Sequence, residues 1–133
     1  ICRSPMGEGM FRHALPKVQV TSAGLGAMTG HGADPMAIAL MLEQQIDIAT
    51  HRAKMITDIM ARDNDMIFVM DNGQKEQTLR QYPFARGKVF RLGDPIQQDI
   101  PDPYQLGKEA FRASHSLIQQ SCDAWVKRIL SIS

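Results

Sequence analysis

The chain has 133 residues, of which 44% are hydrophobic, and its 15 Lys and Arg and 14 Asp and Glu give a net charge of +1. This length suits one domain over residues 1–133 with a single core, and the mixed charges exclude a basic stripe for binding nucleic acid. No apolar run approaches the roughly 20 residues that cross a bilayer, so we expect no membrane insertion.

The chain opens with the signals of a helix start. Ser4 is a good N-cap, Pro5 suits the first helical position, and Glu8 falls in the first turn, where the helix dipole favours an acid. We therefore expect a helix from Pro5 to about Leu15. The alternation of apolar and polar residues over 17–22 then predicts a short strand.

Strands and helices alternate through the rest of the chain, and the continuous apolar run over 66–70 is typical of a strand buried on both faces. The other expected elements are a helix after Asp34-Pro35, a short helix over 57–61, a helix over 74–82, a strand over 88–92 and a long helix over 108–130. This alternation predicts an α/β fold, a three-layer sandwich in which helices flank a short four-stranded parallel sheet. The first of those strands has no counterpart in the printed sequence, so we expect it before Ile1.

A guanidinium, a hydroxyl and unpaired backbone N–H groups meet at the start of the first expected helix. Cys2, Arg3 and Ser4 supply these groups, and a helix N-terminus with such groups binds phosphate. A second reading takes Arg3 as a surface side chain and Ser4 as a helix cap without a ligand. These residues alone support the two readings equally.

Ile1-Cys2-Arg3-Ser4-Pro5 resembles the second half of the signature Cys-x-Gly-Asn-Ile-Cys-Arg-Ser-Pro of the low-molecular-weight protein tyrosine phosphatases. Other stretches resemble that family in the same order, namely Thr21-Ser22-Ala23-Gly24, Gly32-Ala33-Asp34-Pro35, Thr50-His51-Arg52-Ala53, Val69-Met70-Asp71 and Ile100-Pro101-Asp102-Pro103-Tyr104. Gln105 stands where many eukaryotic members have a second tyrosine, and in this it is similar to the bacterial branch associated with exopolysaccharide tyrosine kinases. The resemblance implies hydrolysis of protein phosphotyrosine without a metal or other cofactor.

The resemblance also implies a phosphocysteine mechanism. The family's nucleophile is the first cysteine of the signature, which would lie five residues before Cys2 and so upstream of Ile1. The printed chain alone is therefore expected to be inactive. Arg3 would bind two phosphoryl oxygens, and Ser4 would hydrogen-bond the thiolate. Cys2 is either a small buried residue or a redox partner that forms a reversible disulfide with the nucleophile.

The loop that follows the last expected strand carries the candidate general acid. Asp102 matches the family's acid/base, which protonates the departing phenolate and later activates water. Asp99 is its nearest rival, and a loop aspartate before proline could instead only form an Asx turn. By the same resemblance, Tyr104 and Leu25 would be walls of the phosphotyrosine slot.

Ser22 and His51 match family positions that support the phosphate loop by bonding to its asparagine.

Two other functions stay open: a phosphate or phosphotyrosine binder without catalysis, and an arsenate reductase on the same fold, for which Cys122 would have to relay a disulfide. Because two cysteines form neither a disulfide framework nor a metal-ligand pair, we expect a cytoplasmic protein. Its expected partner is a tyrosine-phosphorylated protein, such as a bacterial tyrosine kinase, and its expected state is a monomer.

Overall fold

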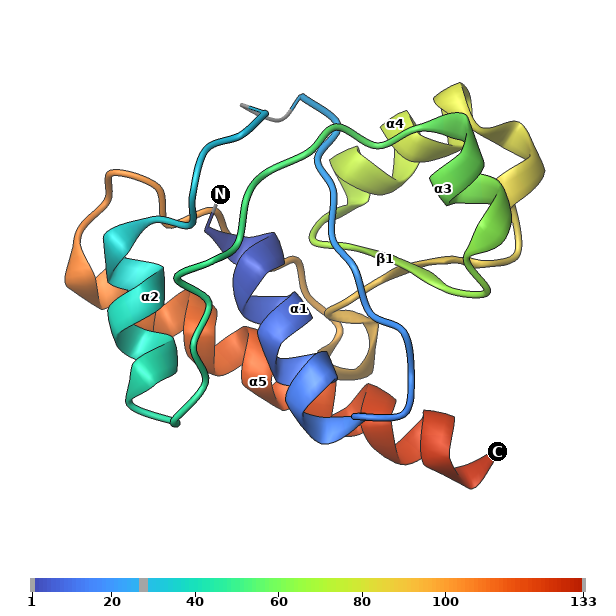
Figure 1. Ribbon diagram of the computed structural model, residues 1–133. Helices are drawn as coiled ribbons and strands as arrows, with labels where there is room; N and C mark the ends of the chain where they lie inside the picture. Colours follow the sequence, from blue (N-terminus) through green and yellow to red (C-terminus); the bar gives the residue numbers. More distant parts are fainter. Residues whose placement is uncertain (1, 27–28, 133) are drawn as a thin grey trace.

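The structure is a computed structural model that describes residues 2–26 and 29–132, and it consists of a parallel sheet with helices on both faces (Figure 1). The elements are α1 (Arg3–Ala14), α2 (Pro35–Leu42), α3 (Asp58–Asp63), β1 (Ile67–Val69), α4 (Asn72–Gln81), the 3-10 turn η1 (Pro83–Ala85), β2 (Val89–Arg91), the 3-10 turn η2 (Asp94–Ile96) and α5 (Lys108–Ser131). The predicted α/β fold is confirmed.

The sheet separates two apolar clusters. β1 and β2 pair in parallel with Phe68 opposite Phe90, and successive side chains of a strand point to opposite faces. Phe68 stacks on Phe11 of α1 at 5.2 Å between ring centroids and meets Trp125 of α5 at 4.8 Å. The large core therefore lies between the sheet and the pair α1 and α5. A smaller cluster on the other sheet face consists of Val69, Ala85 and Val89.

The expected helices α2, α3 and α4 are present and each has a side-chain cap, but α4 begins at Asn72, before the expected range 74–82. Asp34, Thr57 and Asp71 each accept a hydrogen bond from a backbone N–H in the first turn of α2, α3 and α4. The long final helix is also confirmed, and its apolar stripe is buried from Phe111 to Trp125. In the described ranges, no helix combines the length and apolar character that a bilayer crossing requires.

The start of α1 differs from the prediction. The helix begins at Arg3, and its N-cap is Cys2, whose side chain makes no capping bond. Ser4 is therefore not the cap, and Glu8 lies beyond the first turn, which contains no acidic residue. The helix can start before Pro5 because none of the first N–H groups has an intrahelical partner, so proline loses nothing there.

The expected strand over 17–22 is wrong, because Val18 N–H donates to the Leu15 carbonyl at 3.0 Å in a turn after α1, and the rest of the segment is not part of a sheet. Its alternating pattern makes one face apolar, yet a strand also needs a neighbour to complete its hydrogen bonds, and none pairs with it among the described residues. The Val20 carbonyl instead accepts a hydrogen bond of 2.6 Å from Arg12. Complete burial of 66–70 is also wrong, since Ile67 and Phe68 are only half-buried in the two-stranded sheet.

The Trp125 indole offers a test of this core. Its Nε1 donates a buried hydrogen bond of 2.8 Å to the Leu92 carbonyl, just after β2. Trp125→Phe should lower the free energy of unfolding by about 1–3 kcal/mol in urea titrations, because it leaves a buried carbonyl unpaired. Ile132→Ala, at a side chain that is 81% exposed, is the control and should change it by less than about 0.5 kcal/mol. Equal unfolding midpoints for Trp125→Phe and the unmodified protein would contradict this role.

Candidate active site

A cavity of about 470 Å³ opens at the N-terminus of α1. Its walls include every site residue that the sequence predicted, namely Cys2, Arg3, Ser4, Ser22, Leu25, His51, Asp102 and Tyr104. These residues come from four stretches of chain: the start of α1, the segment over 22–26, the segment over 51–54 and the loop that precedes α5. The fold thus gathers the predicted residues around one helix end.

The N-terminus of α1 is suited to an anion. Its first backbone N–H groups have no intrahelical partners, and no acidic side chain in the first turn offsets the positive end of the helix dipole. The side chain of Arg3 is 13% exposed and donates from Nη1 to the Asp71 carboxylate at 3.0 Å and to the Ile100 carbonyl at 2.7 Å. The guanidinium is therefore fixed at this helix end.

Asp71 is a site residue that the sequence prediction missed. One carboxylate oxygen accepts from the Gln74 backbone N–H at 2.8 Å and caps α4, while the other accepts from Arg3. The sequence feature that could have identified Asp71 was its position directly after a predicted strand and before a predicted helix, at the carboxyl edge of a parallel sheet. That place predicts a capping aspartate near the ligand site, but it does not identify Arg3 as the partner.

The loop with Asp102 is tightly turned. Asp102 Oδ1 accepts from the Tyr104 backbone N–H at 3.1 Å, and Leu106 N–H donates to the Pro103 carbonyl at 3.0 Å. Gln105 closes the turn with a positive φ of 61°, which is uncommon outside glycine. The Asx turn is thus present, and it occupies one of the two carboxylate oxygens of Asp102.

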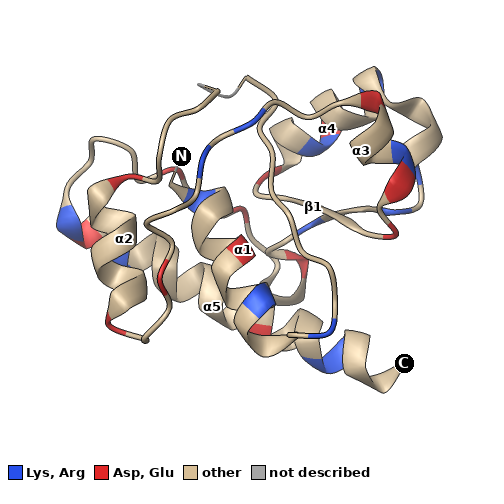
Figure 2. Ribbon diagram, in the orientation of Figure 1, with Lys and Arg blue, Asp and Glu red and all other residues tan. Residues whose placement is uncertain are grey.

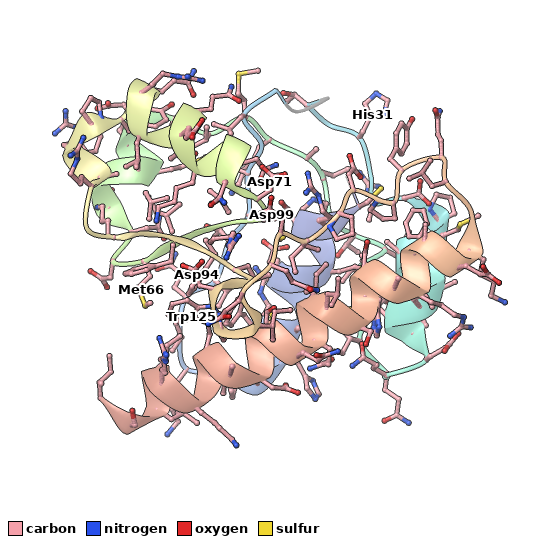
Figure 3. All side chains as sticks on the ribbon, turned by 180° about the vertical axis from the view of Figure 1, so that it is seen from behind. His31, Met66, Asp71, Asp94, Asp99 and Trp125 are labelled. Carbon is pink, nitrogen blue, oxygen red and sulfur yellow. The ribbon has the colours of Figure 1, made fainter. Side chains whose placement is uncertain are left out.

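The rival carboxylate, Asp99, has other partners. Its Oδ1 accepts from the Asn72 backbone N–H at 3.1 Å and forms an ion pair of 3.0 Å with Arg91. The hydrogen bond to Asp99 raises the pKa of Arg91. Figure 3 shows Asp99 beside Asp71, and it is not among the residues that line the cavity. This geometry favours Asp102 as the group available to a ligand.

The two expected supporting residues lie at the cavity wall. His51 Nδ1 lies 3.2 Å from Glu8 Oε2, and the two side chains are only 10% and 14% exposed. Glu8 therefore fixes the orientation of the imidazole. The Ser22 hydroxyl oxygen is buried and makes no hydrogen bond within the described residues. Because the expected asparagine is not in the printed sequence, its contact with Ser22 and His51 stays a prediction.

Both cysteine thiols are held in the protonated form at neutral pH. Burial, assisted by the Asp34 carboxylate, raises the pKa of Cys2 from 9.0 to about 11. Burial also raises the pKa of Cys122, on α5, to about 12. Neither thiol has the low pKa of a reactive nucleophile. In the described part of the chain, no cluster of three His, Cys, Asp or Glu side chains could hold a metal ion.

Lys54, in the wall formed by residues 51–54, is a second cavity residue that the sequence prediction missed. Gly24 and Met55 form a parallel bridge, in which Gly24 N–H donates to the Lys54 carbonyl at 2.9 Å. This pairing brings Leu25 and Lys54 to the same cavity. Lys54 follows the motif Thr50-His51-Arg52-Ala53 directly, and this proximity was the available signal. Gln74 and Gln77 of α4 complete the wall.

Comparison with known proteins gives consistent matches over the whole chain. The model of the low molecular weight phosphotyrosine protein phosphatase family matches residues 1–131. The probable low molecular weight protein-tyrosine-phosphatase EpsP of Ralstonia nicotianae is 45% identical over 99% of this chain and 91% of its own length. Wzb of Escherichia coli K12, a phosphatase of the same description, is 37% identical over 97% of this chain and 88% of its own length.

The fold has a close counterpart among solved structures. The structure of Vibrio vulnificus Wzb in complex with benzylphosphonate has a TM-score of 0.92 and 40% identity, and the match covers 96% of this chain and 91% of that one. The α/β fold of this chain is thus shared with Vibrio vulnificus Wzb. The chain belongs to the low molecular weight phosphotyrosine protein phosphatase family, and so to the protein-tyrosine-phosphatases, as the sequence resemblance predicted.

Replacement of Asp71 by asparagine separates its two contacts. Asn is also a good N-cap, so α4 should keep its start, while the ion pair with Arg3 is lost. In the complete protein, Asp71→Asn should lower kcat/KM for an aryl phosphate by about 10- to 100-fold, because Arg3 is no longer held in place. The unfolding free energy should fall by only about 1 kcal/mol or less. Unchanged kinetics would contradict the positioning role.

Proposed function

We propose that the complete protein hydrolyses protein phosphotyrosine through a phosphocysteine intermediate. The observation that carries this proposal is the guanidinium of Arg3, fixed at an unneutralised helix N-terminus in the same cavity as Asp102 and Tyr104. An anion site beside a carboxyl group and an aromatic side chain suits an aryl phosphate. The family supplies the reaction type, and these residues supply its parts.

The free nitrogens of Arg3 support the phosphate role. Both hydrogen bonds that Arg3 makes within the described residues, to Asp71 and to Ile100, use Nη1. The N–H groups of Nε and Nη2 form the other edge of the planar guanidinium and remain available. That edge can bind two phosphoryl oxygens in a fork, which a lysine cannot do.

The reaction then has two steps. A thiolate from the cysteine that the family places five residues before Cys2 attacks phosphorus, and the phosphorus–oxygen bond to the phenol breaks as Asp102 gives its proton to the departing oxygen. Ionised Asp102 next takes a proton from water, whose oxygen attacks the phosphocysteine and releases phosphate and the thiolate. Arg3 stabilises the charge on the transferred group in both steps. The Ser4 hydroxyl would stabilise the thiolate.

The walls of the cavity suit an aromatic substrate. Tyr104 is 40% exposed and Leu25 is half-buried, and both line the cavity. The benzylphosphonate bound to Vibrio vulnificus Wzb carries a phosphonate on a benzyl group, which resembles the phosphotyrosine side chain. We propose a tyrosine-phosphorylated protein as the substrate, such as a bacterial tyrosine kinase of polysaccharide export, and a cytoplasmic monomer as the enzyme.

The two other functions have less support. A disulfide relay of the arsenate reductase type would need an accessible thiol, whereas Cys122 is 1% exposed and its pKa is raised to about 12. A phosphotyrosine binder would need only Arg3 and the helix terminus. The identity of the residue five positions before Cys2 separates binder from enzyme, and serine or alanine there would favour the binder.

The role of Asp102 is tested with leaving groups of different quality. Asp102→Asn should slow hydrolysis of phenyl phosphate by about 100-fold or more, because phenolate is a poor leaving group that needs a proton. The loss for p-nitrophenyl phosphate should be much smaller. Asp99→Asn is the control, since Asp99 pairs with Arg91 outside the cavity. Equal losses for both substrates would remove Asp102 as the acid.

The role of Arg3 is tested by keeping its charge and changing its shape. Arg3→Lys should lower kcat for p-nitrophenyl phosphate by about 100- to 1,000-fold, because the forked contact with the transition state is lost. Arg12→Lys, on the same helix but outside this cavity, should keep nearly full activity. A fully active Arg3→Lys enzyme would overturn the proposed role. Binding of a phosphotyrosine peptide without turnover by the unmodified protein would instead favour the binder.

A further inference from the structure

One cationic side chain of the cavity has no part in the proposed reaction. Resting on the proposed function, we infer that Lys54 determines substrate preference, so that the enzyme favours phosphotyrosines with an acidic residue within about two positions in the sequence. Lys54 lines the same cavity as Arg3 and Asp102 but lies on a different segment, the extended stretch before α3.

The backbone around Lys54 is held firmly. The Lys54 carbonyl accepts from Gly24 N–H at 2.9 Å, and Ile56 N–H donates to the Gly24 carbonyl at 3.0 Å. On the other side, Ala53 N–H donates to the His31 carbonyl at 2.7 Å. The backbone of Lys54 is therefore fixed at the cavity wall. Its exposed side chain is flexible and can reach a bound substrate peptide.

The ammonium group of Lys54 has no carboxylate partner among the residues that the structure describes. The other charged groups of the cavity are already assigned: Arg3 pairs with Asp71 and would bind the phosphoryl group, and Asp102 is the proposed acid. Lys54 is thus the cationic group left to meet the substrate outside the phosphate. Figure 2 shows basic residues on this segment, close to the start of α1.

The reach of the groups limits the preference to nearby positions. An extended peptide advances about 3.3 Å per residue, so a carboxylate one or two residues from the phosphotyrosine comes within range of a lysine side chain. Lys54 and the loop that carries Asp102 belong to different segments of the cavity wall. We therefore expect the preference on one side of the phosphotyrosine, at the positions that lie nearest Lys54.

The effect should be modest and sensitive to salt. An exposed ion pair of this kind corresponds to about a 1.5- to 5-fold advantage in kcat/KM. The contact exists both before and during the chemical step, so the advantage should appear in KM and leave kcat unchanged. It should shrink as ionic strength rises, because salt screens exposed charges beyond about 8 Å at 0.15 M.

The experiment compares matched phosphotyrosine peptides with the complete protein. Each pair carries Glu or Gln at one position, from two residues before to two residues after the phosphotyrosine, and is otherwise uncharged. The readout is the ratio of kcat/KM for the Glu and Gln peptides. We expect a ratio of about 1.5 to 5 at the best position, about 1 for Lys54→Gln, and below 1 for Lys54→Glu.

Arg52 supplies the matched control. It lies two residues before Lys54, but its Nη1 donates to the carbonyls of Ala49 and His51. Lys54 borders both the active-site cavity and a neighbouring cavity of about 440 Å³, whereas Arg52 lines only the neighbouring one. Arg52→Gln removes the same charge from the same segment and should keep the ratio of the unmodified protein. A change equal to that of Lys54→Gln would mean that net charge, and not Lys54, sets the preference.

Three further outcomes would overturn the inference. The first is a ratio near 1 at every position in the unmodified protein, with normal hydrolysis of both peptides, which leaves the proposed function standing. The second is a Lys54→Glu enzyme, folded by circular dichroism, that keeps the preference for Glu. The third is no hydrolysis of any peptide by the complete protein, in which case the proposed function fails and this inference with it.

Discussion

The arrangement of the site depends on one guanidinium. Through a single nitrogen, Arg3 joins the start of α1 to the Asp71 carboxylate after β1 and to the Ile100 carbonyl in the loop before α5. Three stretches that are far apart in sequence are thereby fixed to one another at 2.7–3.0 Å. Hydrogen bonds with an ionised partner are strong and directional, so this contact sets the position of the helix end relative to both loops.

Backbone hydrogen bonds to the sheet also fix the loop that carries Asp102. Beyond the last paired residues, Leu92 N–H donates to the Val69 carbonyl at 2.7 Å and Ile100 N–H donates to the Met70 carbonyl at 2.9 Å. The carbonyl of the same Ile100 then accepts from Arg3. The backbone of Ile100 thus links the sheet to Arg3 at the start of α1. The Ser114 hydroxyl anchors the next carbonyl, that of Pro101, to α5 at 2.7 Å, so the loop is held before and beside Asp102.

The aspartates near the cavity differ in availability because they differ in partners. Asp71 has both oxygens engaged, by Arg3 and by the Gln74 backbone N–H, whereas Asp99 pairs with Arg91. One carboxylate oxygen of Asp102 accepts a hydrogen bond from the Tyr104 N–H within its own loop. The proposed acid needs a free carboxylate oxygen at the cavity, and of these three aspartates only Asp102 lines the cavity. The same logic separates Lys54, which has no ion pair in the described residues, from Arg3.

The sequence determined what local chemistry controls, and the tertiary structure decided what depends on distant partners. The caps at Asp34, Thr57 and Asp71, the two apolar strands and the long stripe of α5 are local patterns, because a helix start or an apolar run needs only its own neighbours. The motifs also identified residues that the fold brings to one cavity. Local pattern failed at 17–22, since a strand exists only through a neighbour, and at Asp71 and Lys54, whose significance lies in what they face. Asp99 and Asp102 are not distinguished by their local sequence. Only the fold pairs Asp99 with Arg91 and places Asp102 at the cavity.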